Sequence, residues 1–282
     1  MRFSQSNAEV FAPRGFAVEE ALAQTTHLAI GAHQDDLEIM AVDGILACYQ
    51  RPDAWFSGVI VTDGAGSPRT GLYADTTDEE MQAVRVLEQK RAAFLGDYSA
   101  QVFLAHPSQA VKQSGEQSVI NDLIKVIIAA SPRIVYTHNL ADKHPTHVGV
   151  AVKVVQALRQ LSPAQRPEKV YGCEVWRDLG WMLDEDKVVF DTSAQPGLQQ
   201  ALLGVFDSQV SGGKRYDLAT MGRRVANATF FESHATDETT GLAFGIDLTP
   251  LILDPQLDIQ TYIRGYIDRF ADDVARLISS VS

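Results

Sequence analysis

The sequence predicts an α/β protein with a mostly parallel, Rossmann-like sheet that is covered by helices on both faces. Short apolar runs alternate with helical segments along most of the 282 residues, and this alternation is typical of parallel sheets. The runs are mostly apolar and show no regular alternation with polar residues, as expected for strands that are buried on both faces. In such sheets, ligands bind beyond the carboxyl ends of the strands.

Six apolar runs are the expected strands. They are residues 27–32, 56–62, 102–105, 134–137, 170–175 and 188–191. The chain has no repeat, no low-complexity tract and no Gly/Ser linker. We therefore expect a single domain over residues 1–282.

Helical segments are expected between these strands, and one of them has clear ends. Thr77 and Glu80 form a capping box, and Gly96 provides a stop at the carboxyl end. Two further helices are expected at residues 117–130 and 146–161.

The last helix is expected to begin at Asp254, which can cap it, with Pro255 in its first turn. Apolar residues then recur at helical spacing, which produces one apolar stripe. They are Ile259, Ile263, Tyr266, Phe270, Val274 and Leu277. We interpret the stripe as core packing, and a subunit interface in a homo-oligomer is the alternative.

Composition narrows the class of protein. The chain has 36 acidic and 24 basic residues, a formal net charge of −12, which argues against a nucleic-acid-binding surface. No apolar run reaches the roughly 18 residues that span a membrane, and residues 1–15 lack the apolar segment of a signal peptide. The expected location is the cytoplasm. Cys48 and Cys173 are expected to be small core residues, which fits a reducing compartment.

Polar side chains follow the first and the fourth expected strands. His33 and Asp36 lie three residues apart at the end of the first strand, and His144 and His147 lie three residues apart just before a helix. Each motif alone is more typical of a structural histidine or a helix cap. Because the carboxyl ends of parallel strands share one edge of the sheet, we expect the two motifs to converge there.

Such a group of side chains suits a catalytic metal. Zinc binds imidazole nitrogen and carboxylate oxygen, and a catalytic site has three protein ligands and one water. Two histidines and one aspartate meet this need. Zinc lowers the pKa of the water toward about 7, and a neighbouring carboxylate can accept its proton. The joint placement therefore favours a metal site.

Four segments form an ordered set of motifs: AHQDDLEI, VTDGAGS, RVLEQKRAAFLG and DKHPTHVGV. They resemble, in the same order, the motifs of the LmbE-like (PIG-L) zinc de-N-acetylases, whose signatures are AHPDD(x)E and D-x-HPDH. The resemblance implies the fold of that family, with a catalytic core at about residues 25–160. Residues 161–282 would complete the fold and the pocket.

The resemblance implies a metal centre and a reaction. His33, Asp36 and His147 would bind Zn²⁺, with Fe²⁺ as an alternative metal. The reaction would be hydrolysis of the N-acetyl group of a small N-acetylglucosamine-type substrate.

The resemblance also implies roles in catalysis. Asp35 would be the general base for the water. His144 would stabilise the oxyanion as an imidazolium and protonate the leaving amine. Asp142 would orient a histidine, or alternatively form a turn.

Several positions depart from the family motifs. Gln34 replaces the usual proline, Ala65 replaces the usual glutamate of the second loop, and MAVDG (residues 40–44) replaces a glycine-rich stretch. Larger side chains in MAVDG should reshape either the pocket or the helix packing beneath it. These changes leave the expected chemistry intact and leave the substrate open.

Other polar residues have weaker signals. Arg69, just beyond the second loop, is a candidate donor to substrate hydroxyls, and a solvated loop arginine is the alternative. The segment from Lys214 to Arg224 is basic within an acidic chain. We expect solvated or inter-subunit charge there, and a pocket wall for an anionic group is the alternative. His138 is expected to be structural, although it lies near the same edge of the sheet.

Three other functions compete with this interpretation. A metallo-hydrolase of esters or non-sugar amides would use the same site, and a sugar-binding relative would have lost catalysis. A nicotinamide-dependent oxidoreductase is disfavoured because the pattern GxGxxG is absent after the first strand.

Overall fold

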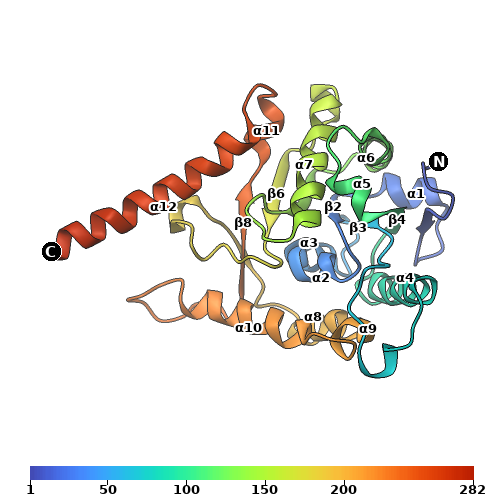
Figure 1. Ribbon diagram of the computed structural model, residues 1–282, viewed down its shortest axis with the longest axis horizontal. Coiled ribbons are helices and arrows are strands. Elements are labelled where there is room, and N and C mark those ends of the chain that lie inside the picture. The colour runs from blue at the N-terminus through green and yellow to red at the C-terminus, as the bar shows by residue number, and fades with distance from the viewer.

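Eight strands form one sheet in the computed structural model, which describes residues 1–282 (Figure 1). The strands are β1 (Glu9–Phe11), β2 (His27–Gly31), β3 (Phe56–Thr62), β4 (Ala100–His106), β5 (Ile134–His138), β6 (Lys169–Cys173), β7 (Val188–Asp191) and β8 (Leu242–Asp247). Their order is β1-β4-β3-β2-β5-β6-β8-β7. The strands from β4 to β6 in this order are parallel, which confirms the predicted fold class, whereas β1 and β8 pair antiparallel with their neighbours.

The six predicted strands correspond to β2 through β7, and β3 and β7 have the predicted bounds. The prediction misses β1 and β8, which join the sheet antiparallel. β1 has only three residues, too few for a pattern to emerge. In β8, Gly245 follows only three apolar residues, so the apolar run is too short to stand out.

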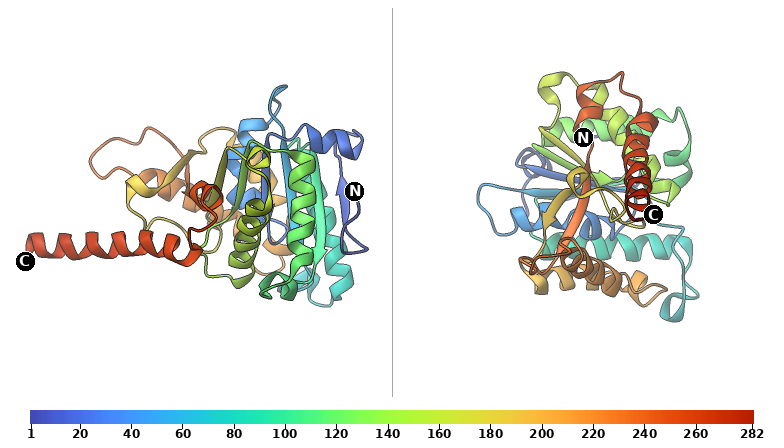
Figure 2. Two further views of the ribbon diagram at one scale, coloured as in Figure 1. Left: turned by 90° about the horizontal axis from the view of Figure 1, so that it is seen from above. Right: turned by 90° about the vertical axis from the view of Figure 1, so that its left-hand side faces the viewer.

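Helices cover both faces of the sheet (Figures 1 and 2). They are α1 (Val18–Ala23), α2 (Asp36–Met40), α3 (Val42–Cys48), α4 (Asp78–Leu95), α5 (Ser108–Lys112), α6 (Gln117–Ala130), α7 (Pro145–Gln160), α8 (Pro196–Gly204), α9 (Asp207–Val210), α10 (Tyr216–Thr229), α11 (Thr249–Leu253) and α12 (Ile259–Val281). Short 3-10 helices occupy Gly71–Tyr73, Pro163–Gln165 and Asp184–Asp186. One apolar core lies between the sheet and α1, α5, α6, α7 and α11, and a second lies between the sheet and α2, α3, α4 and α8.

Burial on both faces explains the mostly apolar runs. In β2, Leu28 and Ile30 belong to one core and Ala29 to the other. Each fully buried Leu or Ile side chain stabilises the fold by about 1.5–3 kcal/mol. A polar residue in the middle of β2 would face one of the cores, so polar residues appear only where the strand ends.

Capping residues determine where the helices begin and end. The capping box of Thr77 and Glu80 is formed, and Gly96 is the carboxyl cap of α4, both as predicted. The predicted start of α12 is wrong. Asp254 ends α11, since its backbone N–H bonds to the Pro250 carbonyl, and its side chain forms a turn with Gln256 (2.9 Å). Asp258 caps α12 instead, accepting from the Thr261 N–H at 2.8 Å.

The apolar stripe of α12 is only partly core, which corrects the interpretation from sequence. Ile259, Tyr262, Ile263 and Tyr266 pack against the first core, but no residue of this helix is fully buried. The helix then leaves the body of the protein (Figure 2). No helix in the structure combines the length and the apolar character needed to cross a membrane.

A buried carboxylate ties α2, which begins the candidate site, to its neighbours. Glu38 accepts hydrogen bonds from the Tyr98 hydroxyl at 2.7 Å and from the Gln89 amide at 2.8 Å. Gln89 belongs to α4, and Tyr98 lies just before β4. Burial raises the pKa of Glu38 from 4.5 to about 7, since these hydrogen bonds offset only part of the desolvation.

This carboxylate should make stability depend on pH. The pKa of Glu38 is higher in the folded state than in the unfolded state. Its contribution to the free energy of unfolding is therefore fully present below pH 4.5 and is lost as the pH rises to about 7. Glu38→Gln removes this titration. The free energy of unfolding of the variant minus that of wild type should be about 3 kcal/mol more positive at pH 8 than at pH 4.5. Urea denaturation at both pH values measures the change, with exposed Glu232→Gln as the control. An equal pH dependence in wild type and Glu38→Gln would contradict it.

Candidate metal and catalytic site

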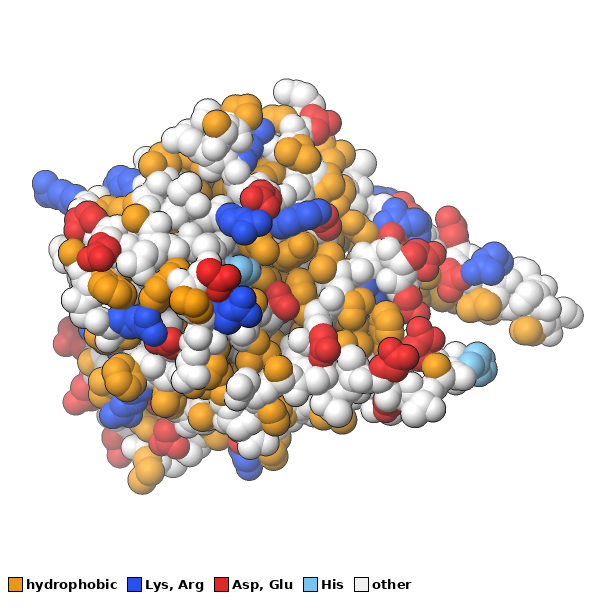
Figure 3. Space-filling view, turned by 180° about the vertical axis from the view of Figure 1, so that it is seen from behind, with side chains coloured by type: hydrophobic (Ala, Val, Ile, Leu, Met, Phe, Trp, Pro, Cys, Tyr) orange, Lys and Arg blue, Asp and Glu red, His pale blue; other side chains and the backbone are white.

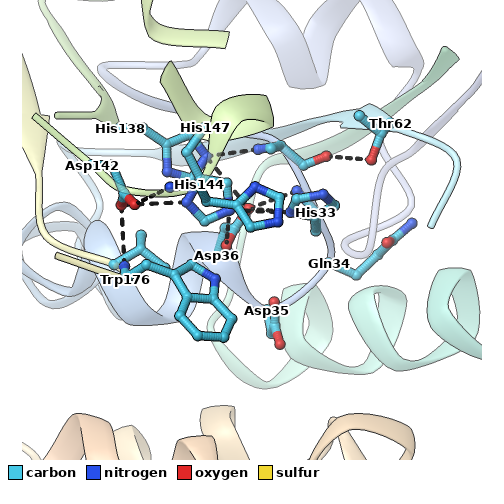
Figure 4. A network of polar contacts seen from close by, with 12 residues as sticks. His33, Gln34, Asp35, Asp36, Thr62, His138, Asp142, His144, His147 and Trp176 are labelled. Carbon is cyan, nitrogen blue, oxygen red and sulfur yellow. Dashed lines mark hydrogen bonds and ion pairs between the residues drawn. The ribbon is translucent and has the colours of Figure 1, made fainter. Parts of the chain in front are cut away.

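The carboxyl ends of β2 and β5 bring the two predicted motifs together (Figure 4). His33 Nδ1 lies 3.3 Å from Asp36 Oδ2 and 3.2 Å from His147 Nε2. His147 Nε2 lies 3.4 Å from Asp36 Oδ1. The convergence expected from the strand ends is therefore present, although 114 positions separate His33 from His147.

Asp35 makes the tight turn between β2 and α2. Its φ of +92° lies in the left-handed region, which is costly for a residue other than glycine. The turn lets the two neighbouring aspartates point different ways. Asp36 points to the histidines and accepts the His33 backbone N–H at 2.6 Å, while Asp35 points away from them into a cleft (Figure 4).

Asp142 orients the second motif. Its carboxylate accepts the backbone N–H groups of His144 (2.9 Å) and Trp176 (3.1 Å) and lies 3.4 Å from His147 Nδ1. Because His147 donates through Nδ1, its Nε2 lone pair is free to point toward His33 and Asp36. Asp142 thus combines the two roles that the sequence left open, since it shapes the turn before α7 and holds a histidine ring.

The contacts among His33, Asp36 and His147 have the spacing of ligands around a tetrahedral cation. Ligands at about 2.0–2.1 Å from zinc are separated from one another by about 3.3–3.4 Å in a tetrahedron. His33 Nδ1 lies 3.2 Å from His147 Nε2 and 3.3 Å from Asp36 Oδ2, and His147 Nε2 lies 3.4 Å from the other carboxylate oxygen, Asp36 Oδ1. Two overlapping groups, His33 with His144 and His147, and Asp36 with His138 and His147, each place one possible ligand atom per residue within 4.8 Å of the others. The residues present could therefore hold a divalent metal.

His138 supports this group from behind. Its Nε2 accepts the Ala32 N–H at 2.9 Å, so its lone pair is already used, and its ring stacks on His147 with centroids 3.9 Å apart. Burial, together with the charge of His147, lowers the pKa of His138 to about 4, which keeps the ring neutral. This geometry is that of a structural histidine, as expected from the sequence.

The two aspartates differ in their affinity for a proton. Burial raises the pKa of Asp36, but His147 and His138 lower it by more, so the pKa lies well below its usual range. Burial raises the pKa of Asp35 well above its usual range, offset in part by Arg85, whose Nη2 lies 3.6 Å from Asp35 Oδ1. Asp36 is therefore suited to bind a cation, and Asp35 is suited to accept a proton.

His144 lines the cleft as a neutral ring. Burial, followed by the charges of His147 and His33, lowers its pKa to about 4. This corrects the expectation of an imidazolium, because a ring with this pKa is uncharged near pH 7. A neutral imidazole still has one N–H that can donate into the cleft.

A cleft of about 460 Å³ opens over these groups. His33, Asp35 and His144 line it on one side, and Ser67 and Pro68 from the loop after β3 line another. A second hollow of about 360 Å³ adjoins it and shares Trp176, Lys214 and Tyr216 with the first. Figure 3 shows a histidine at a depression in this face, beside basic and apolar side chains.

Arg69 does not line the cleft. Its guanidinium donates to the carbonyls of Ala65 (2.7 Å) and Thr76 (2.9 Å) and pairs with Asp78. The arginine braces the loop after β3, so the geometry does not support the predicted contact with substrate hydroxyls.

The departures from the family motifs lie mainly in the interior. A Cβ on Gly44 would come within 2.6 Å of the Tyr136 ring, whose hydroxyl donates to Asp43 at 2.7 Å. Ala41 and Val42 are buried. The side chains of MAVDG therefore lie in the helix packing, and none of them lines the main cleft. Gln34 is also buried, and its carbonyl accepts a hydrogen bond from Arg85.

The basic segment divides into different roles. Arg224 is buried and donates to the carbonyls of Glu38 and Ile39, which contradicts the expected solvated charge at this position. Arg215 pairs with Asp217. Lys214 has no ion pair and faces both hollows, with its Nζ 4.8 Å from the centre of the Trp176 ring. The pocket-wall alternative therefore holds for Lys214.

The analysis from sequence missed Trp176 and Tyr216, which line both hollows. A signal for Trp176 exists, because it follows β6 by three residues and β6 is parallel to β5. The rule that ligands bind at the carboxyl ends of strands applies to it equally. Tyr216 begins α10, which contributes no strand end, so no comparable signal exists.

Residues 28–158 match the family model described as PIG-L: GlcNAc-PI de-N-acetylase. The matched range contains both converging motifs. This part of the chain is therefore a PIG-L (LmbE-like) domain, as the sequence motifs indicated.

Solved structures share the fold. The N,N'-diacetylchitobiose deacetylase from Pyrococcus horikoshii has 16% identity and a TM-score of 0.60, and the match covers 78% of this chain and 83% of that one. The 4-carboxy-2-hydroxymuconate hydratase GalB from Pseudomonas putida KT2440 has 16% identity and a TM-score of 0.58, over 79% and 96% of the chains. The A40926 pseudoaglycone deacetylase has 14% identity and a TM-score of 0.56, over 79% and 97%. Two deacetylases and a hydratase thus have folds similar to this one.

Loss of the Asp142 charge should weaken metal binding. In Asp142→Asn the turn can persist, but the carboxylate that polarises His147 is gone, so affinity for Zn²⁺ should fall about 10–100-fold. Competition with a chromophoric chelator measures the affinity. Asp178→Asn is the matched control, since Asp178 is exposed and also accepts a backbone N–H (from Gly180). Wild-type affinity in Asp142→Asn would show that Asp142 only shapes the loop.

Proposed function

We propose that this protein is a zinc-dependent deacetylase that hydrolyses the N-acetyl group of a small N-acetylglucosamine-type substrate. The observation that carries the proposal is the triangle of His33, Asp36 and His147 beside a cleft. The family model, described as a GlcNAc-PI de-N-acetylase, supports the assignment of the N-acetyl amide bond as the bond that is broken.

The cation would be held by His33, Asp36 and His147. When bound, it would supply Lewis acidity, which makes a water molecule more acidic and polarises the acyl carbonyl. Zinc is favoured by the donor set of two imidazoles and one carboxylate, and Fe²⁺ is the alternative.

Asp35 would accept the proton of the attacking water. Its side chain is 10% exposed and opens into the cleft, where the water and the acetyl group would meet. The raised pKa of Asp35 gives the carboxylate a greater affinity for that proton than an ordinary carboxylate has. Arg85, whose Nη2 lies 3.6 Å from Asp35 Oδ1, opposes this rise because its positive charge stabilises the ionised carboxylate.

His144 would act on the other side of the acyl group. Its neutral N–H would donate to the acyl oxygen as negative charge develops there. When the carbon–nitrogen bond breaks, the leaving amine takes up the proton that Asp35 accepted, directly or through His144. Acetate and a primary amine are released, and the two catalytic side chains return to their starting protonation states.

The two hollows suit a sugar with a further substituent. The larger has a volume of about 460 Å³, within the usual range for small-molecule sites. Trp176 would pack on the apolar face of the sugar ring. The adjoining hollow of about 360 Å³, with Lys214 on its wall, would receive the group attached to the sugar.

A panel of substrates tests the assignment. The zinc-loaded protein would be assayed with N-acetylglucosamine derivatives, acetylated peptides and esters, and released amine or acid would be measured. Release from the N-acetyl sugars alone supports the proposal. Release only from peptides or esters would assign another metallo-hydrolase, and zinc binding with no hydrolysis would assign a sugar-binding protein.

Asp35→Asn should separate catalysis from metal binding. Asparagine tolerates the left-handed turn but cannot accept the proton, so turnover should fall about 10²–10⁴-fold while zinc content is retained. Metal analysis and kcat measure the two effects. Asp63→Asn, at a second carboxylate of the cleft, is the control and should retain most of its turnover. Loss of zinc from Asp35→Asn would mean that the two aspartates have exchanged roles.

His147→Ala should lose both zinc and activity. The buried ring supplies one corner of the triangle, and alanine provides no ligand. Zinc content after dialysis and amine release give the result, with the exposed His234→Ala as control. Full zinc content and full activity in His147→Ala would remove the basis of the proposed function.

A further inference from the structure

The carboxyl-terminal helix α12 projects from the body of the protein (Figure 2). Its first turns are anchored, since Tyr262 donates to the Asp247 carbonyl at 2.5 Å and Arg269 pairs with Asp186 at 2.7 Å. Phe270 meets Trp181 edge-on, with centroids 6.2 Å apart. Beyond Phe270, the hydrogen bonds and ion pairs of side chains stay within the helix.

The projecting part carries an exposed apolar seam. Its members are Ile267 (46% exposed), Phe270 (37%), Val274 (40%), Leu277 (53%) and Val281 (85%). Their spacing alternates between three and four residues, the pattern of positions a and d in a coiled coil. Ile278 (60% exposed) lies beside Leu277 and widens the seam near the end of the helix. The spacing of the other members is the pattern with which one helix packs against another.

Charge on α12 favours a second copy of this chain. The helix has three arginines and three aspartates, whereas the whole chain has a net charge of −12. The charged residues are Arg264, Asp268, Arg269, Asp272, Asp273 and Arg276. Two copies would repel each other over most of their surfaces, but not along this helix.

The size of the seam corresponds to a small protein contact. The exposed fractions of these side chains, with that of Ile278 (60%) beside them, correspond to roughly 600 Å² of apolar surface per copy. Complete burial of the seam in both copies would remove at most about 1,200 Å², so the contact lies at or below the lower end of the range for specific protein interfaces. A contiguous apolar patch of this size is at the upper limit of what monomers expose.

We propose that the apolar seam of α12 packs against the same seam of a second copy, in a two-fold symmetric pair of helices. The same residues would meet from both sides, as a two-fold axis requires. A membrane surface fits less well, because helices that lie on membranes carry an excess of Lys and Arg on their polar face. The proposal does not depend on the proposed function, since α12 lines neither hollow.

Sedimentation velocity of the full chain tests the proposal. Wild type should sediment as a dimer at about 50 µM, a concentration well above the Kd of a micromolar contact. The double variant Val274→Asp, Leu277→Asp should sediment as a monomer. Ala275→Asp, Ser279→Asp adds the same charge on the opposite side of the helix and should remain a dimer. Circular dichroism should show unchanged helix content in both, since all four positions are exposed.

Several outcomes would overturn it. They are a monomeric wild type at about 100 µM, a double seam variant that still dimerises, and a monomer that binds vesicles containing phosphatidylserine through the seam. The last would assign the seam to a membrane.

Cross-linking gives an independent readout. Leu277→Cys introduces an exposed thiol, whereas Cys48 and Cys173 are buried. A short bismaleimide should join Leu277→Cys into a covalent dimer and should leave Ser279→Cys monomeric. Equal cross-linking of the two variants would contradict a contact along the seam.

Discussion

The carboxylate of Asp36, surrounded by histidine rings at the edge of the sheet, is the interaction on which the rest of the site depends. A buried carboxylate costs several kcal/mol unless positive charge or hydrogen-bond donors compensate. Here the His33 backbone N–H and the ring of His147 do so. The same arrangement leaves lone pairs of His33 and His147 facing one another, which only a cation or a proton relieves. The electrostatics of the site and its fitness for a metal therefore have one cause.

Much of this arrangement could be predicted from the sequence. The strands that carry the motifs are buried on both faces, so their polar ends stand out, and parallel strands end at one edge. The position of Asp142 as both turn and hydrogen-bond acceptor could not be resolved, because both roles use the same residue type. The neutral state of His144 depends on burial and on the charges of other segments, which no local pattern contains. Arg69 and Arg224 show the same limit, because their partners are distant backbone carbonyls.

The cleft is lined by two parts of the chain, one inside and one outside the region that matches the family model. The matched region, residues 28–158, supplies the metal-binding geometry and the loop after β3. Trp176, Lys214 and Tyr216 come from the remainder and form the wall shared by the two hollows. Under the proposed function, the residues for chemistry and those for substrate choice would lie on separate segments. Motifs of the matched region would then predict the reaction better than they predict the substrate.

The separation of the two motifs along the chain also affects how the protein is made. His33 and His147 are 114 positions apart, and their strands meet only when β5 pairs with β2. During synthesis, the first motif leaves the ribosome several seconds before the second, at about 5–20 residues per second. One histidine and one aspartate bind a cation weakly, so a nascent chain with only the first motif would not hold the proposed metal. Its loading would follow assembly of the centre of the sheet.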